Sequence, residues 1–253
     1  MRSDHESEPL VMSETFGIEL EVSNLSITGA QHAINRAGLN WQVKFDGTRH
    51  VSAEAVSPIL DRDRLNEAKK ATRALLASGA TVNKQTGLHV HLGADEYGVE
   101  GIARLVWNWN LAHATIGALV AKSRLNNHFC QAVTLSRLDS WVEHVRNGSI
   151  RNLEGGRYWS LNLNAYSAHR TVEFRLHHGT LNGSKVKAWA EFVSAMANYS
   201  TAGNLLNSSD GWYQPADRLN KVGELLDTLA YAGNLSGDTA EFLKGRAEEL
   251  ATR

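Results

Sequence analysis

The stretch that decides the fold is Phe16-Gly-Ile-Glu-Leu-Glu-Val22, in which acidic and apolar residues alternate strictly. Neighbouring side chains of a β-strand point to opposite faces of the sheet. Glu19 and Glu21 are therefore expected on one face, and Ile18 and Leu20 on the other. This alternation predicts a half-buried strand with one face on a hydrophobic core and one polar face.

Two further segments have the same layout: Gly87-Leu-His-Val-His-Leu-Gly93 and Thr171-Val-Glu-Phe-Arg-Leu176. The first puts His89 and His91 on one face of a strand, and the second does the same for Glu173 and Arg175. If the three strands share a sheet, three carboxylates, two imidazoles and a guanidinium meet on one surface. Such a set of groups is typical of a catalytic or metal-binding site.

Composition narrows the class of protein. The chain has 253 residues, with 26 basic and 27 acidic side chains and no dense basic block, so a nucleic acid partner is not expected. The apolar stretch from Ile102 to Ala121 contains Arg104, Asn108 and His113, which predicts a core helix rather than a membrane span. The single cysteine, Cys130, excludes an internal disulfide, and the start of the chain has no signal peptide pattern. A cytoplasmic protein is expected.

The patterns predict an α+β fold with a mostly antiparallel sheet, because strands alternate with helices and no Gly-rich phosphate loop is found. Residues 1–13 are expected to fray, and residues 14–253 to form a single domain whose C-terminal part, about 184–253, is helical. Strands are expected at about 15–23, 41–45, 51–56, around His89, 159–165 and 170–177. Helices are expected at about 29–36, 63–77, 99–122, 135–146, 184–201, 217–232 and 239–251.

Local signals add details to this scheme. Thr28 is expected to cap the first helix, and Asp46-Gly47 predicts a hairpin turn between strands 41–45 and 51–56. Residues 166–169 are expected to join the antiparallel pair 159–165 and 170–177.

The polar faces favour phosphoryl chemistry. Hard divalent cations such as Mg²⁺ prefer carboxylate oxygen, and His89 could complete a site, leaving His91 to reach a nucleotide. Arg175 lies two residues after Glu173 and could clamp a phosphate beside the cation. The carboxylates available for such a site are Glu19, Glu21, Glu54 and Glu173.

Four carboxylates gathered on one surface should repel one another when no cation is bound. Two carboxylates about 4 Å apart repel by roughly 4 kcal/mol at an effective dielectric constant near 20. Binding of Mg²⁺ with ATP is therefore expected to raise the melting temperature, because a ligand of the folded state stabilises it by mass action.

The ordered motifs resemble those of the amidoligase family, relatives of glutamine synthetase and glutamate-cysteine ligase. They are Gly17-Ile-Glu-Leu-Glu21, Glu54-Ala-Val-Ser-Pro-Ile-Leu60, Gly87-Leu-His-Val-His-Leu-Gly93 and Thr171-Val-Glu-Phe-Arg-x-x-x-Gly-Thr-Leu-Asn182. The likeness spans about Phe16 to Asn182. It implies a glutamine synthetase-like fold, in which a curved antiparallel sheet carries helices on its convex side. It also implies an ATP-dependent carboxylate-amine ligase that forms an amide or peptide-like bond through an acyl phosphate.

The resemblance also implies roles for single residues. Glu19, Glu173 and His89 would share the metal that holds the γ-phosphate, and Glu21 and Glu54 would hold a second metal. Relatives use a further Glu at this second site, and residues 57–60 offer no acid for it. The metals would be Mg²⁺ or Mn²⁺.

In the same comparison His91 would contact ATP, and Arg175 would stabilise the transferred phosphoryl group. Asp46 is a candidate for the group that holds or deprotonates the amine, with the simpler alternative that it only makes the Asp-Gly turn. The carboxylate substrate is not specified by any motif, and the amine could be an amino acid, a polyamine or a peptide. Further matches, interpreted as substrate or phosphate contacts, are Arg157, Asn162 and Asn164.

Two other classes of protein remain open. A metal-dependent amide hydrolase could bind zinc through His89 and His91, although such sites favour imidazole over carboxylate. A non-catalytic module could use the polar face to bind sugars or peptides, but it would not need the arginine and metal-ligand grouping. Tightly bound zinc would favour the first class, and ligand binding that survives Glu173→Ala would favour the second.

Overall fold

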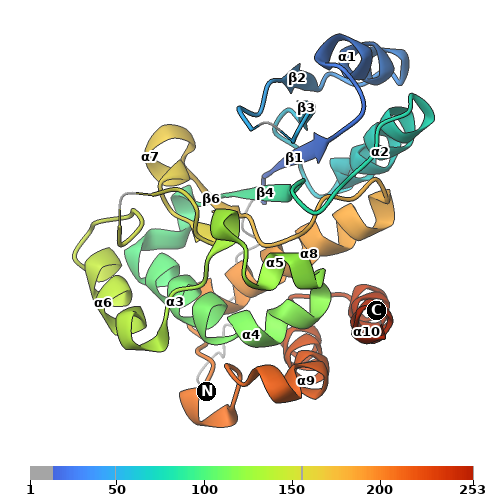
Figure 1. Cartoon of the computed structure of the whole chain (residues 1–253). Coiled ribbons are helices and arrows are strands. Elements are labelled where there is room, and N and C mark those ends of the chain that lie inside the picture. Colours follow the sequence, from blue (N-terminus) through green and yellow to red (C-terminus); the bar gives the residue numbers. More distant parts are fainter. Residues whose placement is uncertain (1–13, 49, 155, 253) are drawn as a thin grey trace, which may run out of the picture.

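One open, antiparallel sheet organises the molecule (Figure 1). The computed structural model describes residues 14–48, 50–154 and 156–252, so the predicted fraying segment 1–13 lies outside the described residues. The order of the strands is β2-β3-β1-β4-β6-β5, and the paired neighbours run antiparallel. The strands are β1 (Phe16–Val22), β2 (Gln42–Lys44), β3 (Ala53–Val56), β4 (Leu88–Gly93), β5 (Leu161–Asn162) and β6 (Thr171–Phe174). The predicted α+β class with an antiparallel sheet is confirmed.

Helices cover the apolar face of this sheet. α1 contacts β2 and β3, α8 contacts β4, and α3 contacts β5. Among the described residues no helix is both long and apolar enough to cross a membrane. The helices are α1 (Ile27–Arg36), α2 (Glu67–Ala77), α3 (Gly98–Leu111), α4 (His113–Ile116), α5 (Lys122–Leu125), α6 (Leu135–Arg146), α7 (Ala165–His169), α8 (Gly183–Thr201), α9 (Arg218–Tyr231) and α10 (Gly237–Ala251).

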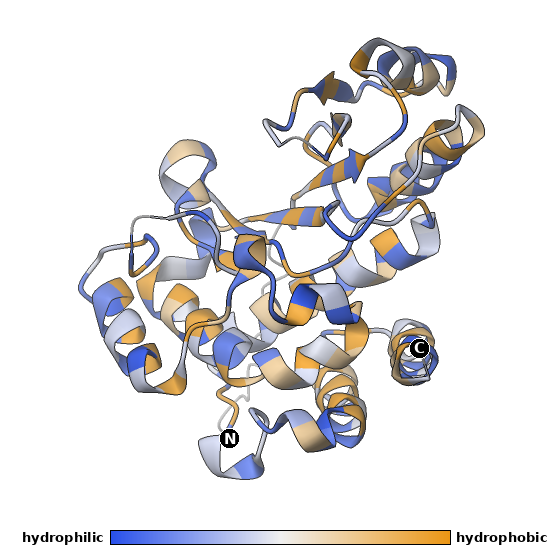
Figure 2. Ribbon diagram, in the orientation of Figure 1, coloured by the Kyte–Doolittle hydropathy of each residue, from blue (hydrophilic) through white to orange (hydrophobic). Residues whose placement is uncertain are grey.

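The predicted alternation along the strands is confirmed. Figure 2 shows hydrophilic and hydrophobic stripes along β1 and β4. The apolar members of the three motif strands are almost fully buried, so the hydrophobic effect fixes which face of each strand points to the core. They are Ile18, Leu20, Leu88, Val90, Leu92, Val172, Phe174 and Leu176.

The helix predicted over 99–122 is wrong in its second half. α3 ends at Leu111, and a separate turn of helix, α4, follows from His113. The side chain of Asn110 donates to the carbonyl of Val106 at 2.8 Å, and Asn108 binds the loop after α8 through Asn204 and Leu206. Side-chain amides that bond the backbone compete with the helical ladder, which accounts for a break near this point.

Three other boundaries differ from the predictions. Ser26, not Thr28, caps α1, accepting from the backbone N–H of Gly29 at 3.1 Å. The connection between β2 and β3 spans 45–52, which is longer than the expected tight turn. The predicted strand 159–165 pairs with β6 only at Leu161 and Asn162, and the expected turn 166–169 belongs to α7.

His113 makes the folded state sensitive to acid. Its imidazole is buried, its Nε2 has no hydrogen-bond partner among the described residues, and burial lowers its pKa to about 4. The unfolded chain binds this proton more readily, so the stability from His113 is full above about pH 6.5 and is lost as the pH falls toward 4. Between these values we expect wild type to lose about 3 kcal/mol more unfolding free energy than His113→Leu. Urea unfolding of both proteins across this pH range measures the difference, and parallel pH curves would contradict it.

Candidate active site

The polar faces of the strands place the predicted site residues in cross-strand rows. Residues that pair across antiparallel strands point to the same face of the sheet. Glu21 of β1 therefore lies beside Glu54, Glu19 lies beside His89, and Glu173 lies beside His91. The rows are Lys44–Glu54–Glu21, Glu19–His89 and His91–Glu173–Asn162. Groups separated by up to 154 positions in the chain thus converge on one surface.

His89 lies at the centre of this surface. Its Nδ1 is 3.2 Å from Glu19 Oε2 and 3.7 Å from Glu173 Oε1, and its Nε2 is 3.5 Å from Glu21 Oε1. The imidazole therefore reaches three of the four predicted carboxylates. The set Glu19, His89 and Glu173, expected to share one metal, is close together in space.

His91 lies near two of the same carboxylates, at slightly longer distances. Its Nε2 is 3.7 Å from Glu19 Oε1 and 3.9 Å from Glu173 Oε1, while its Nδ1 lies 3.0 Å from Thr171 Oγ1. Donor atoms of Glu19, His91 and Glu173 lie within 4.8 Å of one another. His91 can thus act as a ligand in this set, a role that the sequence analysis gave to His89.

Glu173 is fixed from two sides. Arg175 Nη1 donates to its Oε1, and Asn162 Nδ2 donates to its Oε2 at 2.6 Å. Asn162 is itself held by Asn152, whose Nδ2 donates to Asn162 Oδ1 at 2.6 Å. The amide of Asn162 therefore orients Glu173 from its side and also lines the cleft, where its predicted contact with substrate or phosphate stays a prediction.

A second acidic set lies at the other end of the rows. Donor atoms of Glu21, Asp46 and Glu54 lie within 4.8 Å of one another. Asp46 belongs to the loop after β2, where its Oδ2 also accepts from Thr48 N at 3.2 Å and Thr48 Oγ1 at 2.6 Å. Asp46 thus makes the local turn and also provides an acid beside Glu21 and Glu54.

Lys44 is a site residue that the sequence analysis missed. It pairs with Glu54 across β2 and β3, and its ammonium is 3.1 Å from Glu54 Oε2 and 3.6 Å from Glu19 Oε1. Its position two residues before Asp46 was visible, but its opposition to Glu54 depends on the strand register. Arg124 was also missed, because the packing of α5 against the segment after β6, where its Nη2 donates to the carbonyl of Arg175 at 2.7 Å, has no local sequence signal.

Burial and charge set the protonation of the cluster. Burial opposes ionisation of Glu19, but hydrogen bonds from His89 and His91 outweigh it and hold its pKa well below the usual range. Burial, helped by the nearby charge of Glu19, raises the pKa of Glu54 to about 8. For Glu173, burial is outweighed by the charges of Arg175 and the histidines, so its pKa is lowered. The carboxylates therefore differ strongly in their affinity for protons.

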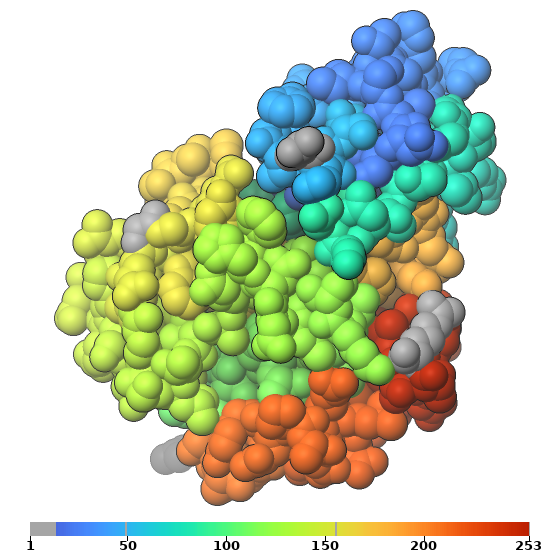
Figure 3. All heavy atoms as spheres, in the orientation of Figure 1, coloured from blue at the N-terminus to red at the C-terminus, as the bar shows by residue number. Residues whose placement is uncertain are grey.

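The cluster forms the floor of a cleft of about 400 Å³. In Figure 3 the surface is notched between the residues around β2 and β3 (blue) and those around α7 (yellow). The walls come from both sides of this notch. They include Phe45, Arg157, Asn164, Ala168 and His169. Arg157 and Asn164 therefore lie at the cleft, and their contact with substrate or phosphate stays a prediction.

An inner cavity of about 170 Å³ continues from the cleft. Its walls include the rings of Phe129 and Tyr158, which meet edge to face at 5.3 Å, and the buried Arg124. The two spaces share Asp46, His89, Arg157 and Arg175. A molecule in the inner cavity would therefore lie against the same arginine as a molecule in the cleft.

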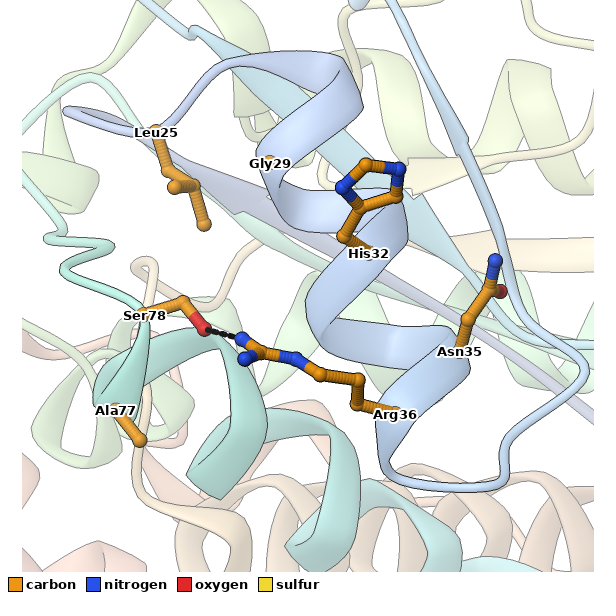
Figure 4. A pocket seen from close by; sticks show the side chains of 7 residues that line it. All are labelled: Leu25, Gly29, His32, Asn35, Arg36, Ala77 and Ser78. Atoms are coloured by element: carbon orange, nitrogen blue, oxygen red, sulfur yellow. Dashed lines mark hydrogen bonds between the residues drawn. The ribbon is translucent and has the colours of Figure 1, made fainter.

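A larger hollow, of about 530 Å³, lies between α1 and α2 (Figure 4). Arg36 reaches across it from α1 and donates to Ser78 Oγ at 3.3 Å. Its described lining has no carboxylate and shares no residue with the cleft. Despite its size, this hollow offers one imidazole, that of His32, and no carboxylate in its described lining, so the chemistry is assigned to the cleft.

The donor set of the cleft fits hard divalent cations. Carboxylate oxygens outnumber imidazole nitrogens in the three sets whose atoms lie within 4.8 Å of one another. Mg²⁺ and Mn²⁺ prefer such oxygen-rich surroundings, whereas structural zinc is held mainly by imidazole and thiolate. The only cysteine of the chain, Cys130, is buried behind Arg124, whose carbonyl lies 3.5 Å from its Sγ. We infer that the residues could hold magnesium or manganese.

A comparison with family models identifies the class of protein. Residues 39–197, more than half of the chain, match the family described as "Putative amidoligase enzyme". The chain belongs to this amidoligase family, which indicates an enzyme of the ligase type that acts on an amine and a carboxylate. The matched region contains Glu54, His89, His91, Glu173 and Arg175, while β1 lies outside it. A comparison with curated proteins gives no match.

Proposed function

We propose that this protein is an ATP-dependent carboxylate-amine ligase that joins its substrates through an acyl phosphate. The observation that carries the proposal is the convergence of Glu19, His89, His91, Glu173 and Arg175 on the floor of one cleft. A phosphoryl-transfer site needs acids to hold cations and an arginine to bind the transferred group. Together with membership of the amidoligase family, this arrangement supports ligase chemistry better than hydrolysis or simple binding.

The acidic groups divide into two sets for two cations. We assign Glu19, Glu173 and a histidine to the first set, because His91 and His89 both reach these two carboxylates. We assign the second set to Glu21, Glu54 and Asp46, so that Asp46 supplies the acid that residues 57–60 lack. When bound, Mg²⁺ or Mn²⁺ would polarise the phosphate oxygens of ATP.

The chain's own residues would position the reactants. Arg175 would bind the γ-phosphoryl group while a substrate carboxylate oxygen attacks the phosphorus and ADP leaves. The amine would then displace phosphate from the acyl phosphate, giving the amide. We assign ATP to the larger cleft and the carboxylate substrate to the inner cavity, because Arg175 borders both spaces. Asn162 would keep Glu173 oriented throughout.

Binding of Mg-ATP is expected to stabilise the folded protein strongly. A ligand present at about 100 times its Kd adds about 2.7 kcal/mol, which corresponds to a rise of roughly 5–10 °C in melting temperature for a chain of this size. A thermal melt with millimolar ATP and MgCl₂, compared with ATP plus EDTA, measures this effect. The same melt after Glu143→Gln, a change on the exposed surface of α6, should show the full rise. No rise in wild type would contradict the proposal.

The reaction itself is tested by ADP release. Wild type is incubated with Mg-ATP and pooled amino acids, polyamines and peptides, each with and without candidate carboxylic acids. Amine-dependent ADP release, with phosphate as the second product, is the expected result. Amide hydrolysis without nucleotide, together with tightly bound zinc, would favour the hydrolase instead.

A further inference from the structure

Lys44 has no role in the proposed ligase, yet it lies inside the acidic cluster. Its ammonium contacts Glu54 at 3.1 Å and Glu19 at 3.6 Å, the two carboxylates that link the first and second cation sets. Both carboxylates are largely buried, whereas 54% of the lysine side chain is exposed. The ammonium of Lys44 therefore lies within the acidic cluster, while much of its side chain is exposed at the cleft.

The ammonium stands where a metal ion would bind. Glu19, Glu54 and His89 offer donor atoms within 4.8 Å of one another, and Lys44 contacts two of these three residues. A divalent cation bound to the same carboxylates would repel the ammonium, since two positive charges would compete for the same oxygens. The lysine and the metal are thus alternatives at this position.

The lysine can leave without unfolding its strand. Lys44 is the last residue of the edge strand β2, and its flexible four-carbon stem lines the cleft. An ammonium displaced from Glu54 would remain in the cleft that we assign to ATP. Lysine binds phosphate as a point charge, so a phosphate oxygen is its natural next partner there.

We propose that Lys44 is an exchangeable counter-ion. Its ammonium occupies the oxygens of Glu19 and Glu54 and balances the negative charge of this pair before a divalent cation binds, is displaced by that cation, and then contacts the phosphates of the nucleotide. The displacement needs only a cation, whereas the phosphate contact rests on the proposed function. This exchange would couple the two binding events, because the metal releases the group that the nucleotide uses.

A fixed structural ion pair is the alternative. In that case removing the lysine would destabilise the protein without strengthening metal binding, because the carboxylates would lose part of their ordering. An exchangeable counter-ion makes the opposite prediction for the metal. Without its competitor, the cation should bind more tightly even though the metal-free protein is less stable.

The test uses Mn²⁺ alone, in the absence of nucleotide. Mn²⁺ binding is titrated by electron paramagnetic resonance and calorimetry on wild type, Lys44→Gln, Lys44→Arg and Lys70→Gln. Lys70→Gln removes the same charge from the exposed surface of α2, a helix that does not line the cleft or the inner cavity, and controls for net charge. We expect Lys44→Gln to bind Mn²⁺ roughly ten-fold more tightly, Lys44→Arg to remain near wild type, and Lys70→Gln to be unchanged.

The outcomes separate this inference from the proposed function. Equal or weaker Mn²⁺ binding by Lys44→Gln, compared with wild type, would overturn the proposal that Lys44 is an exchangeable counter-ion. In a second arm with saturating Mn²⁺, Lys44→Gln should bind ATP several-fold more weakly than wild type, and equal binding would overturn the phosphate contact. Failure of wild type to bind ATP at all would defeat the proposed function, while the comparison with Mn²⁺ alone would still decide whether Lys44 competes with metal.

Discussion

Replacing Glu173 by Gln is expected to lower amine-dependent ADP release by about a thousand-fold, or about 4 kcal/mol of transition-state stabilisation. The substitution keeps the shape of the side chain and removes its charge. Glu173 is nine-tenths or more buried, receives hydrogen bonds from Arg175 and Asn162, and belongs to a set of three metal-ligand candidates. A neutral amide would weaken cation binding and remove the ion pair with Arg175.

The variant should remain folded. The charge of Glu173 is stabilised by the buried Arg175, so its loss should lower the melting temperature without nucleotide, although the amide oxygen of Gln can still accept from Arg175. The rise with Mg-ATP should be largely lost. Steady-state ADP release and thermal melts give both readouts, with Glu143→Gln as the exposed control. Activity of the variant close to wild type would remove Glu173 from the mechanism, whatever happened to stability.

Replacing Trp109 by Ala is expected to lower the free energy of unfolding by about 3–5 kcal/mol, as for other large-to-small changes in cores. The indole is 0% exposed, its ring centroid lies 4.8 Å from that of Phe174, and its Nε1 donates to Ser160 Oγ at 3.0 Å. Domains of this kind have total stabilities of only about 5–15 kcal/mol, so the loss is a large fraction of the whole.

The same substitution should also affect the site. Phe174, the last residue of β6, lies between Glu173 and Arg175 in the chain, so a cavity behind it removes the packing that holds both groups. Urea unfolding measures the stability, and ADP release well below the melting temperature measures the site. Tyr231→Ala is the control, because that aromatic ring is 97% exposed and its removal should change stability by less than about 0.5 kcal/mol. A loss below about 1 kcal/mol for Trp109→Ala would contradict the prediction.

Which side chains face the site was predictable from the sequence, because alternation within a strand depends only on local geometry. Glu19, His89 and Glu173 were expected to converge. In the structure His89 Nδ1 lies 3.2 Å from Glu19 Oε2 and 3.7 Å from Glu173 Oε1. The hydrophobic partners of each motif made this prediction safe, since a shift by one residue would have buried the charged groups.

Which groups stand opposite one another was not predictable. Strand register places Lys44 against Glu54 and His91 against Glu173, and register arises from pairing between segments far apart in sequence. The break after α3 has a similar origin, because Asn108 is bound by residues about a hundred positions away. The predicted helices 184–201, 217–232 and 239–251 agree closely with α8, α9 and α10, because their signals are local.

The position of β1 bears on how this protein should be shortened for expression. β1 is inserted between β3 and β4, although it precedes both in the chain and lies outside the matched region 39–197. A fragment cut to that region would lose an interior strand and leave the backbone edges of β3 and β4 unpaired, which favours aggregation. It would also lack Glu19 and Glu21. We therefore expect a fragment limited to residues 39–197 to fold poorly and to lack two of the predicted metal ligands.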